Sequence, residues 1–589
     1  MSKELLRARN RQMLIFLLIG GGMLVLLGRL YYWQVVQSHG GYNLAQLAND
    51  EHVQNLVLNA PRGLIYDDSG RILATNVVRD DVYVEPIQFS IDHPDNTANY
   101  LNTLIDTLHS VLPKVSLDKL HAAFNSGLQT VRIAVGIDPK QSQRLQELQL
   151  PDVFLQPRTW RVYPSGSLAA QILGYVTQDE NNNTGVYGIE GQYNALLSGK
   201  PGSLTAETDL NGNPLVVGAN DEQPAVNGAN LTLTIDSSVQ YMVESMLAAA
   251  VKQMEAESGT VIVINAHTGA IVAMAGVPTF DPNNYGQYAT LRGCLGSEEA
   301  YFNPALYCAY EPGSTMKTVT MAAALDQGLI TPDTTLNDPG YITFKDAPTV
   351  WNWDDLGYGT ETMTQVLEHS ANVGAAYVAH NLLGPDRFYP YVARFGLGQP
   401  IGIDGPEISG YYRMPTSQGW TVSDLTRQAF GQSILVTPLQ MAMVYETVAN
   451  GGVMMHPYLV SKIDNNGKVV TTQPQVERRV ISAHTAQLLT GMLIQASNHA
   501  LSFTGLVPGY TVAAKTGTAT TQGISADQTE ASVAGFLPAS NPQFVILVKI
   551  DRPQATIYGD TAAAPLWKDI AQQLMWYYHV PPDSSLSTK

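Results

Sequence analysis

The chain has few charged residues, and fewer basic than acidic ones. Only 14% of its 589 residues are charged, and 51 acidic residues against 33 basic ones give a net charge of −18. This charge argues against a nucleic-acid partner, because proteins that bind nucleic acids present basic surfaces. Hydrophobic residues make up 45% of the chain. The composition is therefore that of a globular protein, long enough for two to four domains with sizeable cores.

Signatures of several kinds of site are absent from the sequence. It has no His-Glu-x-x-His or other zinc-ligand spacing, no glycine-rich phosphate loop and no carboxylate dyad, and its 12 histidines are scattered. We therefore expect no metal and no cofactor. No repeat of 20–50 residues is visible, which argues against a repeat architecture.

A stretch shortly after the N-terminus is almost without charge. Residues 13–33 contain one charged side chain, Arg29, and end in Tyr31-Tyr32-Trp33, which suits a membrane interface. This stretch is long enough to cross a bilayer. The basic residues within 1–12 predict a cytoplasmic N-terminus, with the bulk of the chain outside. No small-x-small cleavage site follows, so we favour an uncleaved single-pass anchor over a signal peptide.

Only two cysteines are present, Cys294 and Cys308. An extracytoplasmic location permits a disulfide, and this spacing would close a short loop. Two free buried thiols are the alternative. We expect the bridge.

A Ser-x-x-Lys motif follows the second cysteine. Pro312-Gly313 forms a turn before an apolar pattern at Thr315–Gln327, which predicts a helix ending at Gly328. Ser314 and Lys317 then share one helix face. A desolvated, neutral lysine can take the serine proton and make it a nucleophile. Alone the motif is weak, because an N-cap serine and a surface lysine give the same pattern.

Two further motifs follow in order. Ser370-Ala371-Asn372 lies between two helical stretches, and Lys515-Thr516-Gly517-Thr518 ends a strand that starts near Tyr510. Ser-x-x-Lys, Ser-x-Asn and Lys-Thr-Gly occur together in serine enzymes that act on β-lactam-like amides. All three in this order predict an active site.

Each motif residue has a chemical role to fill. Ser370 can relay a proton to the leaving amine, and Asn372 can hold a substrate amide and orient Lys317. Lys515 can lower the pKa of Lys317 and attract a carboxylate, which the hydroxyls of Thr516 and Thr518 can bind. Gly517 lets substrate backbone approach the strand. The backbone N–H groups of Ser314 and Thr518 would form the oxyanion hole.

Strand patterns at 259–264, 270–275, 510–514, 531–537 and 544–550, with helices between them, predict an α/β (α+β) domain. Its core would be a five-stranded antiparallel sheet with helices on both faces. Asp551-Arg552 is interpreted as a solvated turn. Upstream we expect a β-hairpin at 60–74 and a helical juxtamembrane segment at 34–55. The predicted parts are a cytoplasmic tail at 1–12, an anchor at 13–33, a pedestal at 34–230 with a helical insertion at 96–150, a catalytic domain at 231–580 and a disordered tail at 581–589.

Over nearly its whole length the chain resembles the class B penicillin-binding proteins, membrane-anchored peptidoglycan D,D-transpeptidases. The three motifs match the family's catalytic domain, as do Gly431-Gln432 and Val436–Gln440. Arg62-Gly63 through Ala74 and Gly188-Ile189-Glu190 are similar to its pedestal motifs. The departures are Asp68 where the family usually has arginine, Ala371 in place of serine, and a longer segment at 291–310.

The resemblance implies the reaction and the partners. Ser314 would attack the D-Ala-D-Ala amide of a stem peptide, release D-alanine and pass the acyl group to a neighbouring amine, and β-lactams would acylate the same serine. The pedestal would carry no polymerase, so a membrane-embedded SEDS-type glycosyltransferase would be a partner. Val373-Gly374 and Ser532–Phe536 look more like the division type than the elongation type.

Three alternatives share these motifs. A serine β-lactamase of the commonest class has Glu-x-x-Leu-Asn between the second and third motifs, and none is found here. A D,D-carboxypeptidase differs only in its acceptor, and the motifs barely separate it. A penicillin-binding sensor would need a signalling domain, for which 12 residues before the anchor leave no room.

Overall fold

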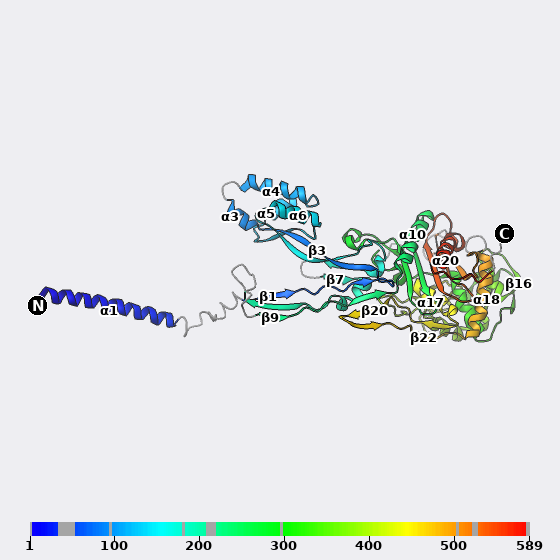
Figure 1. Cartoon of the computed structure of the whole chain (residues 1–589). Coiled ribbons are helices and arrows are strands. Elements are labelled where there is room, and N and C mark those ends of the chain that lie inside the picture. The colour runs from blue at the N-terminus through cyan, green and yellow to red at the C-terminus, as the bar shows by residue number, and fades with distance from the viewer. Residues whose placement is uncertain are drawn as a thin grey trace. The chain divides into compact units, whose positions relative to one another are not determined.

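Figure 1 shows the chain as a computed structural model. The structure describes residues 3–32, 53–93, 97–178, 183–207, 220–294, 299–501, 506–520 and 528–584. They divide into two compact units, Met1–Pro61 with Gly199–Asn227, and Arg62–Ser198 with Gly228–Lys589. The expected juxtamembrane helix lies outside the described residues up to residue 52, and its last three residues belong to a strand instead. Of the predicted disordered tail, residues 585–589 also lie outside them.

The first unit contains one apolar helix and a small sheet. Helix α1 spans Lys3–Tyr31, and its 23-residue segment Arg9–Tyr31, which contains an 18-residue stretch with a mean hydropathy of 2.2, is long and apolar enough to cross a membrane. A helix suits that setting because its backbone hydrogen bonds are all internal. The sheet is antiparallel, in the order β1 (Val53–Leu58), β8 (Gly202–Glu207) and β9 (Asn220–Gln223).

A mixed sheet in the second unit joins strands from both sides of the predicted boundary at residue 230. Its order is β21-β20-β10-β2-β3-β4, and β5 also pairs with β3. The predicted hairpin is confirmed as the antiparallel pair of β2 and β3. The strands are β2 (Ile65–Tyr66), β3 (Ile72–Val84), β4 (Val131–Ala134), β5 (Val153–Val162), β10 (Asn230–Leu233), β20 (Val460–Asn465) and β21 (Lys468–Thr471).

Four short helices gather at one end of β3 (Figure 1). Their apolar faces form a small core with β4, which includes Leu108, Leu120 and Ile133. The predicted helical insertion is therefore confirmed, although it also contributes a strand. The helices are α3 (Pro86–Asp92), α4 (Thr97–Val111), α5 (Leu117–Phe124) and α6 (Pro139–Leu148).

A buried ion network holds the pedestal motifs together. Glu190, on α8 (Gly188–Gln192), is fully buried and accepts hydrogen bonds from Arg62 Nε at 2.7 Å and Arg161 Nε at 2.6 Å. Asp68 is exposed and stands outside this network. Its neighbour Asp67 is the buried carboxylate, and it accepts a hydrogen bond from Ser237 Oγ. Removal of one partner from such a network typically costs about 3–5 kcal/mol.

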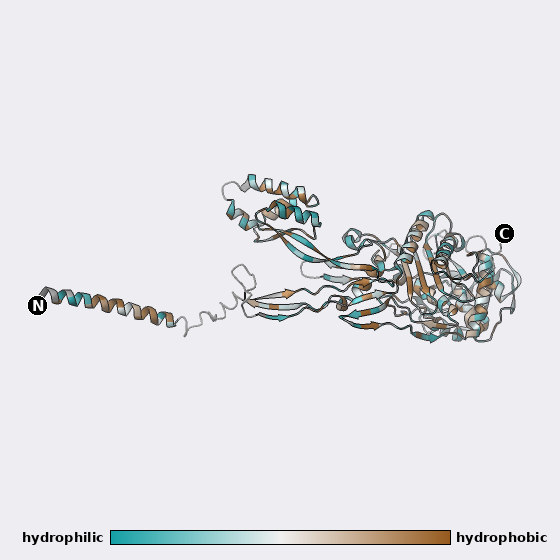
Figure 2. Cartoon of the chain, in the orientation of Figure 1, coloured by the Kyte–Doolittle hydropathy of each residue, from teal (hydrophilic) through white to brown (hydrophobic). Residues whose placement is uncertain are grey.

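The catalytic sheet has the predicted five antiparallel strands, in the order β12-β11-β25-β24-β23. One face packs against α10 and α20 through residues such as Val243 and Trp567, and the other packs against α12 and α17. Figure 2 shows strands of this sheet in the brown of apolar residues, as expected for strands buried on both faces. The elements are β11 (Ser258–Asn265), β12 (Ile271–Val277), β23 (Ala513–Thr520), β24 (Thr529–Leu537), β25 (Phe544–Asp551), α10 (Ser237–Gln253), α12 (Lys317–Asp326), α17 (Pro438–Ala449) and α20 (Ala564–Tyr577).

Short elements connect these layers. Those before the nucleophile turn are α7 (Ala170–Leu173), β6 (Tyr175–Gln178), β7 (Asn183–Val186), α9 (Asn194–Leu197), η2 (Pro282–Tyr288) and α11 (Pro304–Tyr307). From the nucleophile turn to residue 394 they are η4 (Gly313–Met316), β13 (Thr335–Asp338), β14 (Tyr341–Phe344), β15 (Ala347–Trp351), β16 (Gly359–Thr362), α13 (Met363–Glu368), α14 (Asn372–Tyr377), η5 (Val378–Leu383) and α15 (Pro385–Arg394). The remainder are β17 (Tyr411–Tyr412), α16 (Val422–Gln428), β18 (Ile434–Leu435), β19 (Val453–Met455), β22 (Val476–Arg479), α18 (Ala483–Ala500) and α19 (Gly559–Ala562).

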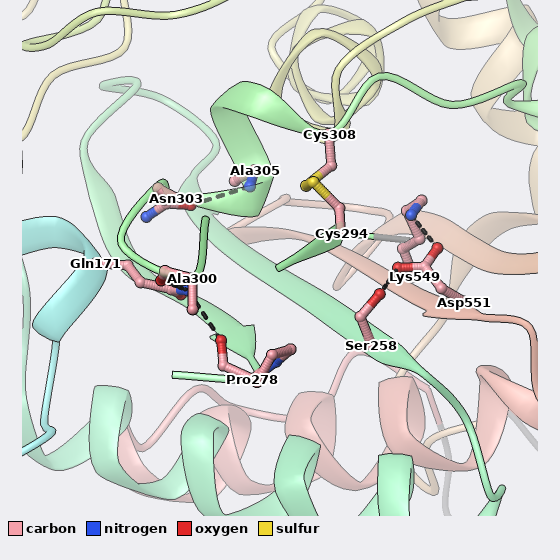
Figure 3. The surroundings of a disulfide bond; sticks show 10 residues. All are labelled: Gln171, Ser258, Pro278, Cys294, Ala300, Asn303, Ala305, Cys308, Lys549 and Asp551. Atoms are coloured by element: carbon pink, nitrogen blue, oxygen red, sulfur yellow. Dashed lines mark hydrogen bonds and ion pairs between the residues drawn. A yellow bond between two sulfur atoms is a disulfide. The ribbon is translucent and has the colours of Figure 1, made fainter. Parts of the chain in front are cut away.

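The interpretation of Asp551-Arg552 as a solvated turn is wrong for Asp551. This residue ends β25 and is 1% exposed. Its carboxylate accepts a hydrogen bond from Ser258 Oγ at 2.5 Å and pairs with Lys549, as Figure 3 shows. Arg552 turns the chain with a φ of +49° and pairs with Glu257. The charged end of this strand is thus part of the interior.

Candidate active site

Ser314 lies in a tight turn at the start of a buried helix. The predicted helix is confirmed, but its first turn, η4, is a 3₁₀ turn, and the α-helix proper begins at Lys317. Thr315 Oγ1 donates to Pro312 O at 2.7 Å and closes the turn. Gly313 takes a φ of +54°, which glycine adopts without strain. The helix N-terminus thus adds partial positive charge at Ser314.

Glycines let three backbone segments meet at this turn. A Cβ on Gly313 would lie 2.8 Å from Thr518 O, and one on Gly517 would lie 2.7 Å from Pro312 O. A Cβ on Gly431 would lie 2.1 Å from Gly313 O, and Gly313 N donates to Gly431 O at 3.1 Å. Real Cβ atoms do not approach this closely, so no side chain fits at these positions. The nucleophile turn is therefore pressed between β23 and the 431–433 segment.

Lys317 joins the first two motifs. Its Nζ lies 3.0 Å from Ser314 Oγ and 3.2 Å from Ser370 Oγ. It donates to Ser370 O at 2.5 Å and to Asn372 Oδ1 at 2.9 Å. Ser370 takes a φ of +57°, and this strained conformation brings both its carbonyl and its hydroxyl to the amine. The structure thus brings together the four residues of the first two motifs that the sequence singled out.

The amine of Lys317 is in an environment that disfavours its charge. The side chain is fully buried, and burial lowers its pKa well below the usual value, with the charge of Lys515 as the second cause. Burial also lowers the pKa of Lys515 to about 8. The desolvated neutral amine that the sequence analysis requires is therefore favoured at Lys317.

The third motif lies within strand β23, not at its end as expected. Lys515 and Gly517 are buried, while Thr516 and Thr518 on the other face are half-buried. Lys515 Nζ lies 3.3 Å from Thr516 O, and Thr518 Oγ1 accepts a hydrogen bond from Gly559 N at 3.0 Å. β23 is an edge strand, and within the described part of the chain its outer side pairs with no strand. That edge can receive an extended peptide.

Several supporting residues were missed from the sequence. Asn372 Nδ2 donates to Trp351 O at 3.1 Å, and Val373 N donates to Asn352 Oδ1 at 3.1 Å. Trp353 Nε1 donates to the carbonyl of His369, the residue before Ser370. These residues come from β15 and the loop after it, and nothing in their own sequence marks them as partners of the motif.

The two cysteines, 14 residues apart, are joined by a disulfide with Cα atoms 5.7 Å apart. Both residues are buried, and Figure 3 shows them near Ser258, Lys549 and Asp551. The bridge ties the segment before the nucleophile turn to itself. No free cysteine remains in the chain.

Two family models match the chain. One, described as the penicillin binding protein transpeptidase domain, covers residues 259–572, and the other, described as the penicillin-binding protein dimerisation domain, covers residues 57–233. The chain belongs to the class B penicillin-binding proteins. The resemblance inferred from the motifs is thereby confirmed, and so is the predicted fold class.

Relatives of this penicillin-binding protein match over most of its length. Penicillin-binding protein PbpB of Mycolicibacterium smegmatis is 34% identical over 77% of the chain and 70% of the relative. Peptidoglycan D,D-transpeptidase FtsI of Escherichia coli is 30% identical over 95% of the chain and 90% of the relative. A solved peptidoglycan synthetase from Bifidobacterium adolescentis, 27% identical, superposes with a TM-score of 0.70 over 90% of this chain and 98% of that one.

Proposed function

We propose that this penicillin-binding protein is a peptidoglycan D,D-transpeptidase whose nucleophile is Ser314 and whose general base is Lys317. The observation that carries the assignment is the set of contacts around Lys317 Nζ. Ser370 O and Asn372 Oδ1 can only accept hydrogen bonds, so they take the two N–H groups of a neutral amine. The lone pair of that amine is then left for the hydroxyl of Ser314.

The reaction follows from this arrangement. Lys317 takes the proton of Ser314 as Oγ attacks the carbonyl carbon between the two D-alanines of a stem peptide. The amide bond breaks, and Ser370 relays a proton to the nitrogen of the leaving D-alanine. Lys317 is then neutral again and takes a proton from an amine of a neighbouring strand as that amine attacks the ester. The new amide forms, and Ser314 leaves with a proton returned from Lys317.

The remaining motif residues bind the substrate. The Lys515 amine reaches across the strand to within 3.4 Å of Thr516 Oγ1, so it can bind the terminal carboxylate together with the Thr516 and Thr518 hydroxyls, and Gly517 keeps the edge of β23 open to the peptide backbone. The oxyanion hole consists of the N–H groups of Ser314 and Thr518. In support, a Cβ on Gly313 would lie 3.2 Å from Thr518 N, so the two backbone segments adjoin.

The proposal also includes the location of the protein in the membrane and its enzyme partner. The basic residues in the first part of α1, before its apolar stretch, favour a cytoplasmic N-terminus and an extracytoplasmic catalytic domain. A pedestal without polymerase motifs implies a SEDS-type glycosyltransferase in the same membrane. Full-length similarity to FtsI, together with Val373-Gly374 and Ser532–Phe536, supports a role in division rather than elongation.

Cross-linking activity tests the proposal. The full chain in detergent is incubated with lipid-linked precursor and a SEDS-type polymerase, and the products are digested and analysed by mass spectrometry. We expect cross-linked muropeptides and free D-alanine with the wild type and neither with Ser314→Ala. Glycan polymer is expected only when the polymerase is present. Equal cross-linking by Ser314→Ala would contradict the assignment, and release of D-alanine without cross-links would identify a carboxypeptidase.

A further inference from the structure

Two buried carboxyl groups lie beside the loop that carries Ser370 and Asn372. Glu361 on β16 is 1% exposed, and Asp338 on β13 is fully buried. The two strands pair antiparallel with Glu361 opposite Leu336, so Asp338 is its diagonal neighbour on the same face. The two side chains lie close enough for one carboxyl group to donate a hydrogen bond to the other, and that bond is one of the causes that raise the pKa of Glu361.

The hydrogen bonds around the pair leave one carboxyl oxygen, Glu361 Oε1, free to carry a proton between the two groups. Asp338 accepts from Gly340 N at 2.7 Å and from Asn352 Nδ2 at 2.8 Å. Glu361 Oε2 lies 3.1 Å from His369 Nδ1, while Glu361 Oε1 meets no donor in the described part of the chain. Two carboxylates cannot bond each other unless one is protonated. A proton on Glu361 Oε1, donated to Asp338, satisfies all four oxygens.

The electrostatic surroundings favour this proton. Burial, followed by the charge of Asp338, raises the pKa of Glu361 to about 8. Burial lowers the pKa of His369, which keeps its ring neutral. The titratable groups that face the pair and His369 are Lys317, Asp354, Tyr358, Glu368 and His499.

The pair is connected to both ends of the catalytic loop. On one side Glu361 contacts His369, the residue before Ser370, whose ring also stacks on Tyr358 with centroids 4.4 Å apart. On the other side Asn352, held by Asp338, accepts from the N–H of Val373, the residue after Asn372. The segment 370–372 is therefore held on both sides, at His369 and at Val373, by one hydrogen-bond network.

We propose that Glu361 and Asp338 are positioning residues that share one proton and hold Ser370 and Asn372 against Lys317. The proposal rests on the proposed roles of Ser314 and Lys317. Loss of the proton would leave two negative charges in contact, break the bond between the strands and release the loop. It would also place a negative charge near Lys317, which favours the ammonium form and removes the base.

The Glu361→Gln variant keeps the shape of the side chain but has no proton to lose, so it tests the role of the proton alone. The amide of Glu361→Gln donates to Asp338 and accepts from His369 at every pH, whereas Glu361→Ala does neither. Second-order rates of acylation by a fluorescent penicillin are measured from pH 6.5 to 9.5 on the full chain. The ratio of the wild-type rate to the Gln variant rate is expected to fall by about tenfold across this range, as a group of pKa about 8 ionises. At pH 6.5 the Gln variant is expected to restore most of an about twentyfold loss in Glu361→Ala.

Thermal unfolding gives a second readout that does not depend on acylation. A carboxyl group whose pKa is raised from 4.5 to about 8 by folding binds its proton more tightly in the folded state. The wild type should therefore lose stability relative to Glu361→Gln as pH rises from 4.5 to 8, and the difference should be constant below 4.5. Glu446 on α17 is a matched control, because its side chain is also fully buried and burial also raises its pKa. Its carboxyl group accepts a hydrogen bond from the N–H of Met455, a residue outside the three motifs. Glu446→Gln should change the stability profile and leave the acylation ratio flat.

Two results would overturn the proposal. One is a ratio of wild-type to Glu361→Gln acylation rates that does not change with pH. The other is an unfolding midpoint with the same pH dependence in both proteins. If the wild type is not acylated at all, the proposed roles of Ser314 and Lys317 fail, and the unfolding comparison still decides whether the proton is shared.

Discussion

Replacement of Lys317 by alanine is expected to slow acylation by penicillin about a thousandfold, which is typical of the loss of a general base. The amine is the group placed to take the proton of Ser314, at 3.0 Å. Lys317→Arg is expected to lose as much, because a guanidinium stays protonated in proteins. The measurement is the rate of covalent labelling by a fluorescent penicillin, followed on gels under denaturing conditions.

The pH dependence of the acylation rate separates a role of Lys317 as the base from a purely electrostatic role. Because burial holds the pKa of Lys317 well below its ordinary value, the neutral amine persists at neutral pH, and wild-type acylation should not need alkaline conditions. Lys462→Ala, at an exposed lysine on β20, is the control and should label at the wild-type rate. Acylation of folded Lys317→Ala within about threefold of the wild type would rule out the assigned base.

The Gly431→Ala substitution is expected to lower the rate of acylation by penicillin about a hundredfold or more, although it changes no residue of the three motifs. Its Cβ would lie 2.1 Å from Gly313 O, so the nucleophile turn must move away from the 431–433 segment. A displacement of about 1 Å at a reacting group can cost about 10² in rate. Acylation rate and thermal unfolding are measured together, since the turn should shift while the rest of the domain stays folded.

Gly467→Ala is the matched control for this substitution. Gly467 also has a positive φ, +89° against +80° at Gly431, but a Cβ there would meet open space. Both variants therefore place an alanine at a positive φ, where a side chain is strained, and only one carries the clash. Equal acylation by the two variants would mean that contact with Gly313 does not position the nucleophile.

The chemistry of the site could be predicted from the sequence because short motifs carry it. Ser314 and Lys317 are one helical turn apart, so their proximity follows from helix geometry alone. The alternation and apolar runs at 259–275 and 531–550 likewise predicted strands of the catalytic sheet, which the structure confirms. Each of these features follows from the residue pattern of one short segment, so it can be predicted from the sequence of that segment.

Features that depend on long-range pairing could not be predicted. β20 joins the pedestal sheet by pairing with β10, more than 220 residues earlier in the chain, and no local pattern names that partner. The contact of Glu361 with Asp338 depends on the pairing of β13 and β16 in one register. Asp551 was misread as part of a solvated turn, because the ion pair with Lys549 that makes its burial tolerable is visible only in three dimensions.

The attacking hydroxyl is located most directly by mapping the penicillin adduct. The full-length wild-type chain is labelled with a fluorescent penicillin, digested, and its modified peptide is sequenced by mass spectrometry. We predict a single adduct on the peptide that contains Ser314, with none formed by Ser314→Ala. An adduct on any other residue, or one that persists in the variant, would contradict Ser314 as the nucleophile.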